Sequence, residues 1–284
     1  MYECFSVEIV DQIAHIVLNR PGKRNSMNLA FWEELPAIVD DIDAHSKARV
    51  IVISSTGPHF TAGIDVTAFA DGNELLDTAD NSDLAERQQG ARFYTTVTRL
   101  QKSFSCLETC RVPVLAAIQG GCIGGGVDLV TACDMRYATE DAFLTIFETN
   151  IGMTADVGTF PRLVKLTPEG FVREMAYTGR RVSADEAQAV GLINRVYPDH
   201  ESMLAGVMEI AADIATKAPL AVYGCKRIIN YARDHNTTDG LDYIGIWNAS
   251  MLHLDEIREA MTANKEQRQG RFADLPPTRN KSRG

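Results

Sequence analysis

Apolar and polar positions repeat with two different periods at the start of the chain. In residues 5–20, FSVEIVDQIAHIVLNR, apolar and polar side chains alternate on both sides of Asp11 and Gln12, which is typical of a β-hairpin with its turn at these two residues. Residues 28–44, NLAFWEELPAIVDDIDA, instead repeat apolar side chains with a helical period, and Asn28 is placed to cap the helix. The pattern predicts two strands followed by a helix.

The middle of the chain continues this alternation of strands and helices. Continuous apolar runs at 48–57 and 113–120 predict buried strands, and shorter runs at 134–139 and 142–147 predict two more. Helical patterns cover 92–110 and 126–133, whereas the acidic, turn-rich residues 70–89 predict a surface loop. Strands that alternate with helices indicate an α/β core with some parallel pairing.

Beyond residue 156 the strand signals nearly vanish. Helical patterns follow at 160–179, 183–191, 201–219, 220–235 and 241–266. We therefore predict two regions, a β/α core at 1–200 that holds the active site and a helical C-terminal region at 201–284.

Composition narrows the classes of partner. The 284 residues carry a formal net charge of −10, which argues against nucleic-acid or anionic-membrane binding. The six cysteines show no metal-ligand or disulfide spacing. No signal-peptide pattern, membrane-spanning run or peroxisomal tripeptide is present, so the expected location is the cytosol. A polyanionic ligand would need local cations, such as Arg20, Lys23 and Arg24 in NRPGKRNSM.

The glycine-rich stretch GGCIGGGVDL, residues 120–129, stands between a predicted strand and a predicted helix. It lacks the frame of a dinucleotide fingerprint and the lysine of a phosphate-binding loop. Two interpretations remain, tight packing of the helix on the strand, or a backbone N–H aimed at an oxygen that becomes negative during a reaction. HFTAGID, which ends with Gly63, Ile64 and Asp65, offers a second strand-end turn. Because an oxyanion hole usually combines two donors from separate segments, the pair favours the second interpretation.

These segments, HFTAGID and AAIQGGCIGGGVDLVTACDMRYAT, resemble the oxyanion segments of the crotonase (enoyl-CoA hydratase/isomerase) superfamily, and the resemblance runs from about residue 7 to residue 266. It implies a spiral of β-β-α units, trimers or dimers of trimers, and a C-terminal helical region that serves oligomerisation. It also implies that the N–H groups of Ile64 and Gly125 hold the thioester oxygen of an acyl-CoA substrate. The expected substrate-binding residues are Ala62, Gly63, Asp65 and Arg24, with no metal and no cofactor beyond the coenzyme A of the substrate.

Three acidic residues indicate which reaction of this family to expect. Asp128, Glu148 and Asp156 lie among apolar and small residues, where a carboxyl group is costly unless it is paired or functional. The set, together with GGCIGGGVDL, ACDMRY and TADVGT, resembles the dienoyl-CoA isomerases of the family. That resemblance implies conversion of 3,5-dienoyl-CoA to 2,4-dienoyl-CoA in fatty-acid β-oxidation, with Asp156 as the base at C2 and Glu148 as the acid at C6. Asp128 would tune the pair or position the diene.

Two alternatives remain open from the sequence. A 2-enoyl-CoA hydratase would use Asp128 and Glu148 to activate water, and Asp156 would be incidental. A non-catalytic acyl-CoA-binding or assembly protein would keep the fold without needing buried carboxyl groups.

Overall fold

Two β-sheets form the centre of the molecule in the computed structural model, which describes residues 2–65 and 83–279. The larger sheet contains, in spatial order, β1 (Phe5–Val10), β2 (Ile13–Leu18), β3 (Val50–Ser55), β4 (Val114–Ile118), β6 (Met135–Thr139) and β9 (Arg195–Tyr197). The smaller sheet contains β5 (Gly121–Ile123), β7 (Phe143–Thr145) and β8 (Val182–Ser183). The predicted α/β core followed by helices is confirmed.

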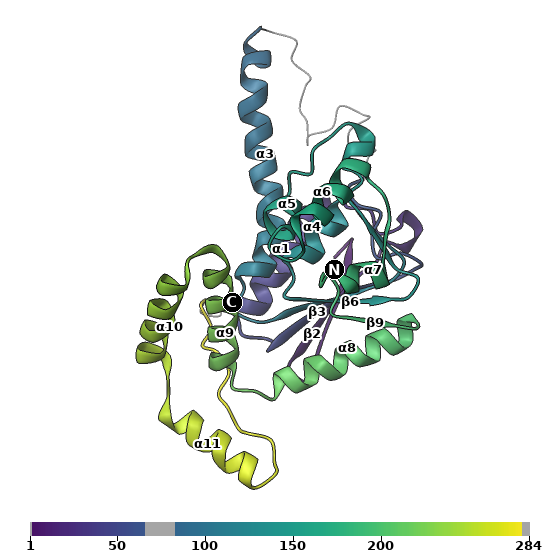
Figure 1. Cartoon of the computed structure of the whole chain (residues 1–284). Helices are drawn as coiled ribbons and strands as arrows, with labels where there is room; N and C mark the ends of the chain where they lie inside the picture. Colours follow the sequence, from purple (N-terminus) through teal and green to yellow (C-terminus); the bar gives the residue numbers. More distant parts are fainter. Residues whose placement is uncertain (1, 66–82, 280–284) are drawn as a thin grey trace.

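The helices cover both sides of the larger sheet. Figure 1 shows α1 (Leu29–Ala44), α3 (Asp83–Thr109) and α4 (Gly125–Ala132) on one side and α8 (His200–Ala215) across the other. The remaining helices are α5 (Thr159–Leu163), α6 (Glu169–Thr178), α7 (Ala184–Ala189), α9 (Pro219–Asp234), α10 (Thr237–Met251) and α11 (Leu254–Lys265), with single 3₁₀ turns at η1 (Pro21–Lys23) and η3 (Glu148–Ile151). No helix in the described ranges is long and apolar enough to cross a bilayer.

The predicted hairpin is confirmed at the start of the larger sheet. β1 and β2 pair antiparallel, and Val10 lies opposite Ile13. The two turn residues between them, Asp11 and Gln12, have φ of 49° and 67°. Two successive left-handed residues give the turn geometry whose twist matches that of a hairpin. From β2 onward every pair of strands in this sheet is parallel.

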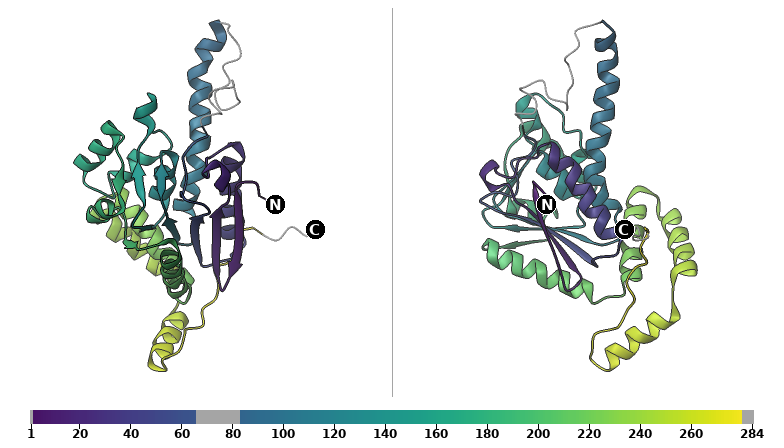
Figure 2. Two further views of the ribbon diagram at one scale, coloured as in Figure 1. Left: turned by 90° about the vertical axis from the view of Figure 1, so that its right-hand side faces the viewer. Right: turned by 180° about the vertical axis from the view of Figure 1, so that it is seen from behind.

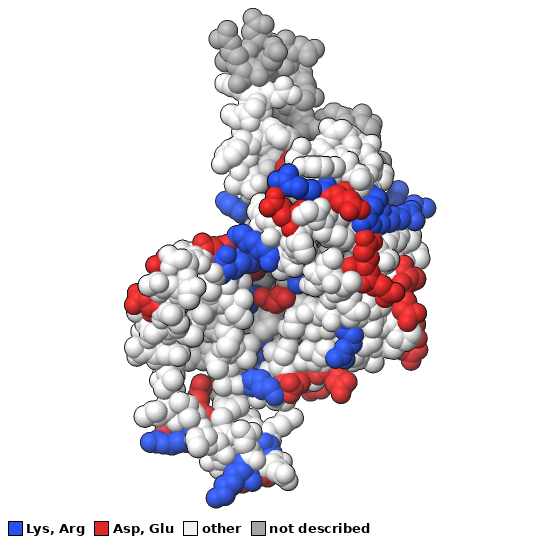
Figure 3. Space-filling view, in the orientation of Figure 1, with Lys and Arg blue, Asp and Glu red and all other residues white. Residues whose placement is uncertain are grey.

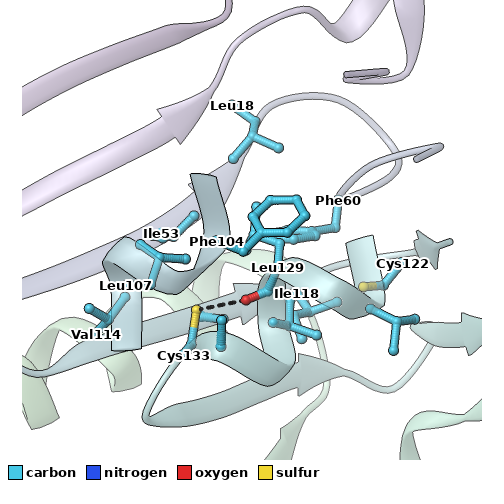
Figure 4. Packing of buried hydrophobic residues seen from close by; sticks show 14 of the residues in the cluster. Leu18, Ile53, Phe60, Phe104, Leu107, Val114, Ile118, Cys122, Leu129 and Cys133 are labelled. Atoms are coloured by element: carbon cyan, nitrogen blue, oxygen red, sulfur yellow. Dashed lines mark hydrogen bonds between the residues drawn. The ribbon is translucent and has the colours of Figure 1, made fainter. Parts of the chain in front are cut away.

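The central strands are apolar throughout because both of their faces are buried. In β3, Ile51 and Ile53 point into the core shared with α1, α3 and α4, whereas Val50 and Val52 point into a second core under α8. Figure 4 shows the first of these cores, in which Ile53 of the sheet packs near Phe104 of α3. Burying one such side chain is worth about 1.5–3 kcal/mol.

Helix α8 packs on the larger sheet through one apolar face. Its residues Met203, Val207 and Ala211, one helical turn apart, all belong to the second core. The helices α9, α10 and α11, which we call the C-terminal arm, instead extend away from the sheet (Figure 2). The predicted division into regions 1–200 and 201–284 stays a prediction as a statement about domains.

One buried lysine joins the C-terminal arm to the core. Lys226 of α9 is only 6% exposed. Its Nζ donates hydrogen bonds to the carbonyl oxygens of Leu107 and Val112, at 2.7 and 2.9 Å, and pairs with Asp134 at 2.9 Å. Since Leu107 lies in the last turn of α3, the ammonium group satisfies carbonyls that the helix end leaves without partners.

Several predicted boundaries are wrong. The helix predicted to begin at residue 92 begins at residue 83, so the end of the predicted 70–89 loop is helical and the rest lies outside the described residues. The stretch predicted as one helix at 160–179 is split into α5 and α6 before Pro168, which disfavours helical backbone at the preceding residue. The strands β8 and β9 lie where only helices and loops were expected; they have two and three residues, too few to show a period.

Candidate active site

The two glycine turns predicted to form an oxyanion hole lie side by side. Thr61 forms a parallel bridge with Cys122 of β5, in which the Thr61 N–H donates to the Gly121 carbonyl at 3.1 Å. A second bridge joins Ile64 to Met27, whose N–H donates to the Gly63 carbonyl at 2.9 Å. These bonds fix the turn on both sides and bring it against the start of α4.

Glycine is required at position 63 for two reasons. The residue has φ +83°, which strains any residue with a side chain, and a Cβ there would lie 2.6 Å from the carbonyl oxygen of Ile123. The same Cβ would lie 3.4 Å from the amide nitrogen of Gly125, and a Cβ on Gly125 would lie 3.8 Å from the amide nitrogen of Ile64. The structure therefore brings together the two amides that the sequence predicts as donors.

Neither amide donates a hydrogen bond within the described part of the chain. No hydrogen-bond acceptor among the described residues is found for the N–H of Ile64 or of Gly125. Gly125 is the first residue of α4, and the first N–H groups of a helix have no partner inside it. Gly124 caps this helix with φ +52°, and a Cβ there would lie 3.1 Å from Oε1 of Glu148. The glycines thus keep clear the space between the helix start and this carboxyl group.

Asp128 is held in the interior from the first turns of α4. It is 1% exposed, and its Oδ1 accepts hydrogen bonds from both the N–H and the Oγ1 of Thr159, at 2.7 and 2.8 Å. Burial raises the pKa of Asp128 to about 7, nearby Glu148 adds to this rise, and the two Thr159 bonds oppose it. A carboxyl group in this position changes charge near neutral pH.

Glu148 opens η3 and faces the start of α4. It is 9% exposed, and its Oε2 has no hydrogen-bond partner among the described residues. Burial is the main cause that raises the pKa of Glu148 above its usual range, with a contribution from Asp156. A buried carboxyl oxygen without a partner favours the protonated form, which can act as an acid.

Asp156 lies at the edge of the same region and is half-buried. Burial raises the pKa of Asp156, though its exposure leaves it the most accessible of the three acids to water. Its carbonyl oxygen accepts a hydrogen bond of 2.7 Å from Nε2 of Gln101 on α3. Asp156 also lines a cleft of about 560 Å³ between α3, the loop before α5 and the end of α9.

The raised pKa of Asp128 has a consequence for stability. The folded state holds the Asp128 proton more tightly than the unfolded chain does. The contribution of Asp128 to the free energy of unfolding therefore falls as pH rises from about 3.8 to about 7, and it does not change further above about pH 7. Asp128→Asn removes the titrating group and keeps an oxygen acceptor. We expect its stability, relative to the unsubstituted protein, to increase between pH 5 and pH 8 in urea denaturation. Parallel pH dependences of the two proteins would contradict the shift.

The predicted substrate-binding residues surround the Gly63 turn. The Ala62 N–H donates to the carbonyl of Arg24 at 2.9 Å, and the Ser26 hydroxyl donates to Oδ2 of Asp65 at 3.2 Å. The side chain of Arg24 is exposed, whereas Ala62 and Asp65 are half-buried. Arg24 is therefore beside the Gly63 turn, with its side chain exposed on the outside.

Sequence reasoning missed the residues that support the site. Asn25 is 3% exposed, and its Nδ2 donates to the carbonyls of Thr56 and His59 at 2.8 and 3.1 Å, which ties the basic loop to the Gly63 turn. Thr159 contacts Asp128 through its N–H and its hydroxyl group, and Gln101 contacts the main chain of Asp156 through its side-chain amide. None of the three stands out in the sequence, because polar residues in loops and on helices are common.

The described residues include no group of three or more His, Cys, Asp and Glu side chains arranged to hold a metal ion. The expectation of a site without a metal stays a prediction, as do the roles of the individual residues.

Comparisons with known proteins agree on one family. A family model described as enoyl-CoA hydratase/isomerase matches residues 8–275. The chain is 43% identical over 269 residues to a rat protein named Delta(3,5)-Delta(2,4)-dienoyl-CoA isomerase, mitochondrial, covering 94% of this chain and 81% of that protein. It is 37% identical to an Arabidopsis thaliana protein of the same name, peroxisomal, covering 93% of both.

Solved structures give the same result for the fold. The crystal structure of an enoyl-CoA hydratase from Bacillus anthracis superposes with a TM-score of 0.84 at 31% identity, covering 95% of this chain and 99% of that one. The expected crotonase-like fold is confirmed. The chain, with its paired glycine turns and its buried acids, belongs to the enoyl-CoA hydratase/isomerase family.

Proposed function

We propose that this protein converts 3,5-dienoyl-CoA to 2,4-dienoyl-CoA in fatty-acid β-oxidation. The observation that carries the proposal is geometric: Glu148, with a buried carboxyl oxygen that has no partner among the described residues, lies against the start of α4, where the amides of Gly125 and Ile64 come together. Asp128 and Asp156 lie close enough to this carboxyl group to raise its pKa or to have their own raised by it. The names of the rat and Arabidopsis relatives support the proposal.

The chemistry begins with the acidic C2–H of the substrate. Asp156 takes this proton as the C2–H bond breaks, and the electron pair forms a C2=C3 bond. The pair of C3=C4 moves to C4=C5, and the pair of C5=C6 takes a proton from Glu148 at C6. The intermediate anion spreads onto the thioester oxygen, where the N–H groups of Ile64 and Gly125 stabilise it.

The two acids suit opposite roles because their surroundings differ. Glu148, with an unpartnered buried oxygen, holds a proton to donate, whereas half-buried Asp156 is the better base. After one turnover Asp156 carries the proton and Glu148 is ionised, so exchange with water or between the acids must restore the starting state. The three acids titrate as a coupled set.

Ultraviolet spectroscopy with two substrates tests the proposal. The purified protein is mixed with 3,5-octadienoyl-CoA in one cuvette and with 2-enoyl-CoA in another. Growth of the conjugated 2,4-dienoyl-thioester band in the first, without loss of the 2-enoyl band in the second, is expected. Loss of the 2-enoyl band alone would make the protein a hydratase. No spectral change in either cuvette, with CoA esters still bound, would indicate a binding protein.

Arg24 is our candidate for the phosphates of coenzyme A. Its exposed side chain lies on the loop that holds Ala62, and phosphate groups favour guanidinium partners. We expect Arg24→Ala to raise KM for the CoA thioester about three- to tenfold with kcat little changed. The N-acetylcysteamine thioester, which lacks phosphates, should show no such rise, and Arg258→Ala on α11 is the matched control. Equal effects on both thioesters would contradict phosphate binding.

Coenzyme A enters the proposal only as part of the substrate. The isomerisation moves protons and electron pairs within one molecule and leaves its oxidation state unchanged, so no redox cofactor or metal is required by the chemistry.

We propose that the C-terminal arm contacts further copies of this chain, as trimers or dimers of trimers. Its side chains Leu241, Ile246, Leu254 and Met261 are all more than half exposed. Figure 3 shows a largely uncharged surface over α10. Exposed apolar area of this kind marks interaction surfaces.

The oligomer can be tested by sedimentation. We expect the protein to sediment as a trimer or hexamer, and Ile246→Glu on α10 to shift it toward smaller species. Val10→Glu, which changes an exposed apolar residue of the hairpin, is the control. A monomer at micromolar concentration would contradict the proposal.

The cytosolic location expected from the sequence stays a prediction. The rat relative is named as mitochondrial and the Arabidopsis relative as peroxisomal, so fractionation of cells should compare all three compartments.

A further inference from the structure

Thr159 connects two parts of the active site that act on neighbouring atoms of the substrate. It is the first residue of α5, 1% exposed, and lies three positions after Asp156. Its backbone N–H and its hydroxyl group both donate to the same oxygen of Asp128. Asp128 belongs to α4, whose first residue is the amide donor Gly125. The hydrogen bonds therefore join the loop of the base to the helix of the oxyanion hole.

The other side of this loop is held by α3. Nε2 of Gln101 donates to the carbonyl oxygen of Asp156 at 2.7 Å. Between the two anchors, Gly158 has φ +132°, and a Cβ there would lie 1.9 Å from Nη1 of Arg162. The segment 156–159 is thus bound to one helix at each end, and a side chain at 158 would strain the backbone and require Arg162 to move. The bonds at the two ends of the segment, together with the buried side chain of Val157 between them, hold it in place relative to Gly125.

We propose that Thr159 is a positioning residue for the isomerisation and that Asp128 acts chiefly as its hydrogen-bond acceptor. These two bonds between Thr159 and Asp128, which we call the clamp, set the position of the base Asp156 relative to the amide of Gly125. The proposal deepens the proposed function and rests on it for the identity of the base.

The spacing matters because the two groups act on adjacent carbons. Asp156 removes a proton from C2, and the amides stabilise charge on the oxygen of C1. Displacing a catalytic group by about 1 Å can lower a rate about 10²-fold. The geometry of Asp128 agrees with an acceptor role, because the N–H and the hydroxyl group of Thr159 both donate to its Oδ1, at 2.7 and 2.8 Å.

Substitutions of Thr159 test the clamp. Thr159→Val removes the hydroxyl donor at nearly constant volume, and we expect kcat for 3,5-octadienoyl-CoA to fall about tenfold with KM within twofold. Thr159→Ser keeps the donor and should restore kcat to within about threefold. The matched control is Thr131→Val, since Thr131 is also buried, at 4% exposed, and its hydroxyl bonds only to main-chain carbonyls of α4. Equal kcat values for Thr159→Val and Thr131→Val would overturn the proposal.

Substitutions of Asp128 separate an acceptor from a proton carrier. Asparagine at 128 still offers an oxygen to Thr159, whereas alanine does not. We expect kcat of Asp128→Asn to exceed that of Asp128→Ala at least tenfold. Equally low values would show that Asp128 acts through its charge or its proton and would overturn its role as acceptor.

A second readout separates failure of the clamp from failure of the proposed function. A 3-oxoacyl-CoA ionises at C2 to an enolate with its own ultraviolet band, and its binding needs no double-bond shift. We expect the bound enolate fraction to fall in Thr159→Val and not in Thr131→Val. If the unsubstituted protein fails to isomerise the dienoyl ester, this measurement still tests the clamp, and equal enolate fractions in the two variants would overturn it.

Discussion

Asp156→Asn is expected to lower kcat for 3,5-octadienoyl-CoA by about 10³-fold, within the 10²–10⁴-fold that a general base typically contributes. The amide of asparagine has nearly the same shape but cannot accept the C2 proton. The hydrogen bond from Gln101 involves only the carbonyl oxygen of residue 156, so the loop should keep its position. Because binding does not require the carboxylate, KM should change little.

The rate is measured from growth of the conjugated dienoyl band. Asp213→Asn, a substitution of an exposed acid on α8, serves as the control. Near-normal isomerisation by Asp156→Asn would refute the assignment of the base. If hydration of a 2-enoyl-CoA survived while no isomerisation was found in either protein, the hydratase interpretation would be correct.

Gly63→Ala should lower kcat/KM by about 10²–10³-fold, the effect of losing one oxyanion donor. A Cβ at position 63 would lie 2.6 Å from the backbone carbonyl of Ile123, so the turn or β5 must move. Either movement separates the Ile64 amide from that of Gly125. The positive φ adds conformational strain, so a lower melting temperature should accompany the loss of rate.

The control for this variant is Gly170→Ala, because a Cβ on Gly170 in α6 meets no atom within 4 Å. Circular dichroism at the assay temperature establishes that both variants are folded. A folded Gly63→Ala protein with normal activity would rule out the oxyanion role of this turn.

The parts of the fold that the sequence predicts well have strong local signals. The hairpin at Asp11 and Gln12, the strand at 50–55 and the helix capped by Asn28 each combine a clear period with a turn or cap residue. The glycines of the two turns and the three acids could also be predicted, because glycine and buried carboxyl groups are costly without a reason.

What could not be predicted depends on contacts between distant residues. The pairing of β7 with β8 joins Leu144 to Val182, and nothing near Val182 signals a strand of two residues. In the sequence Lys226 is indistinguishable from other lysines in helices, and its role follows only from the packing of α9 against the end of α3. Thr159 is likewise unremarkable in ADVGT until folding brings it to Asp128. Such interactions have no local period.

The main-chain origin of the two amide donors affects how this protein can diverge. Every amino acid except proline supplies an N–H at position 64, so drift in the Ile64 side chain leaves the donor in place. The adjacent glycine at 63 is far less free to change, because a Cβ there would meet the Ile123 carbonyl and its φ is positive. Descendants of this chain would therefore keep both proposed amide donors whatever side chain stands at position 64. We expect a new reaction on this backbone to come from exchange of the acids at 148 and 156, with the amide donors left in place.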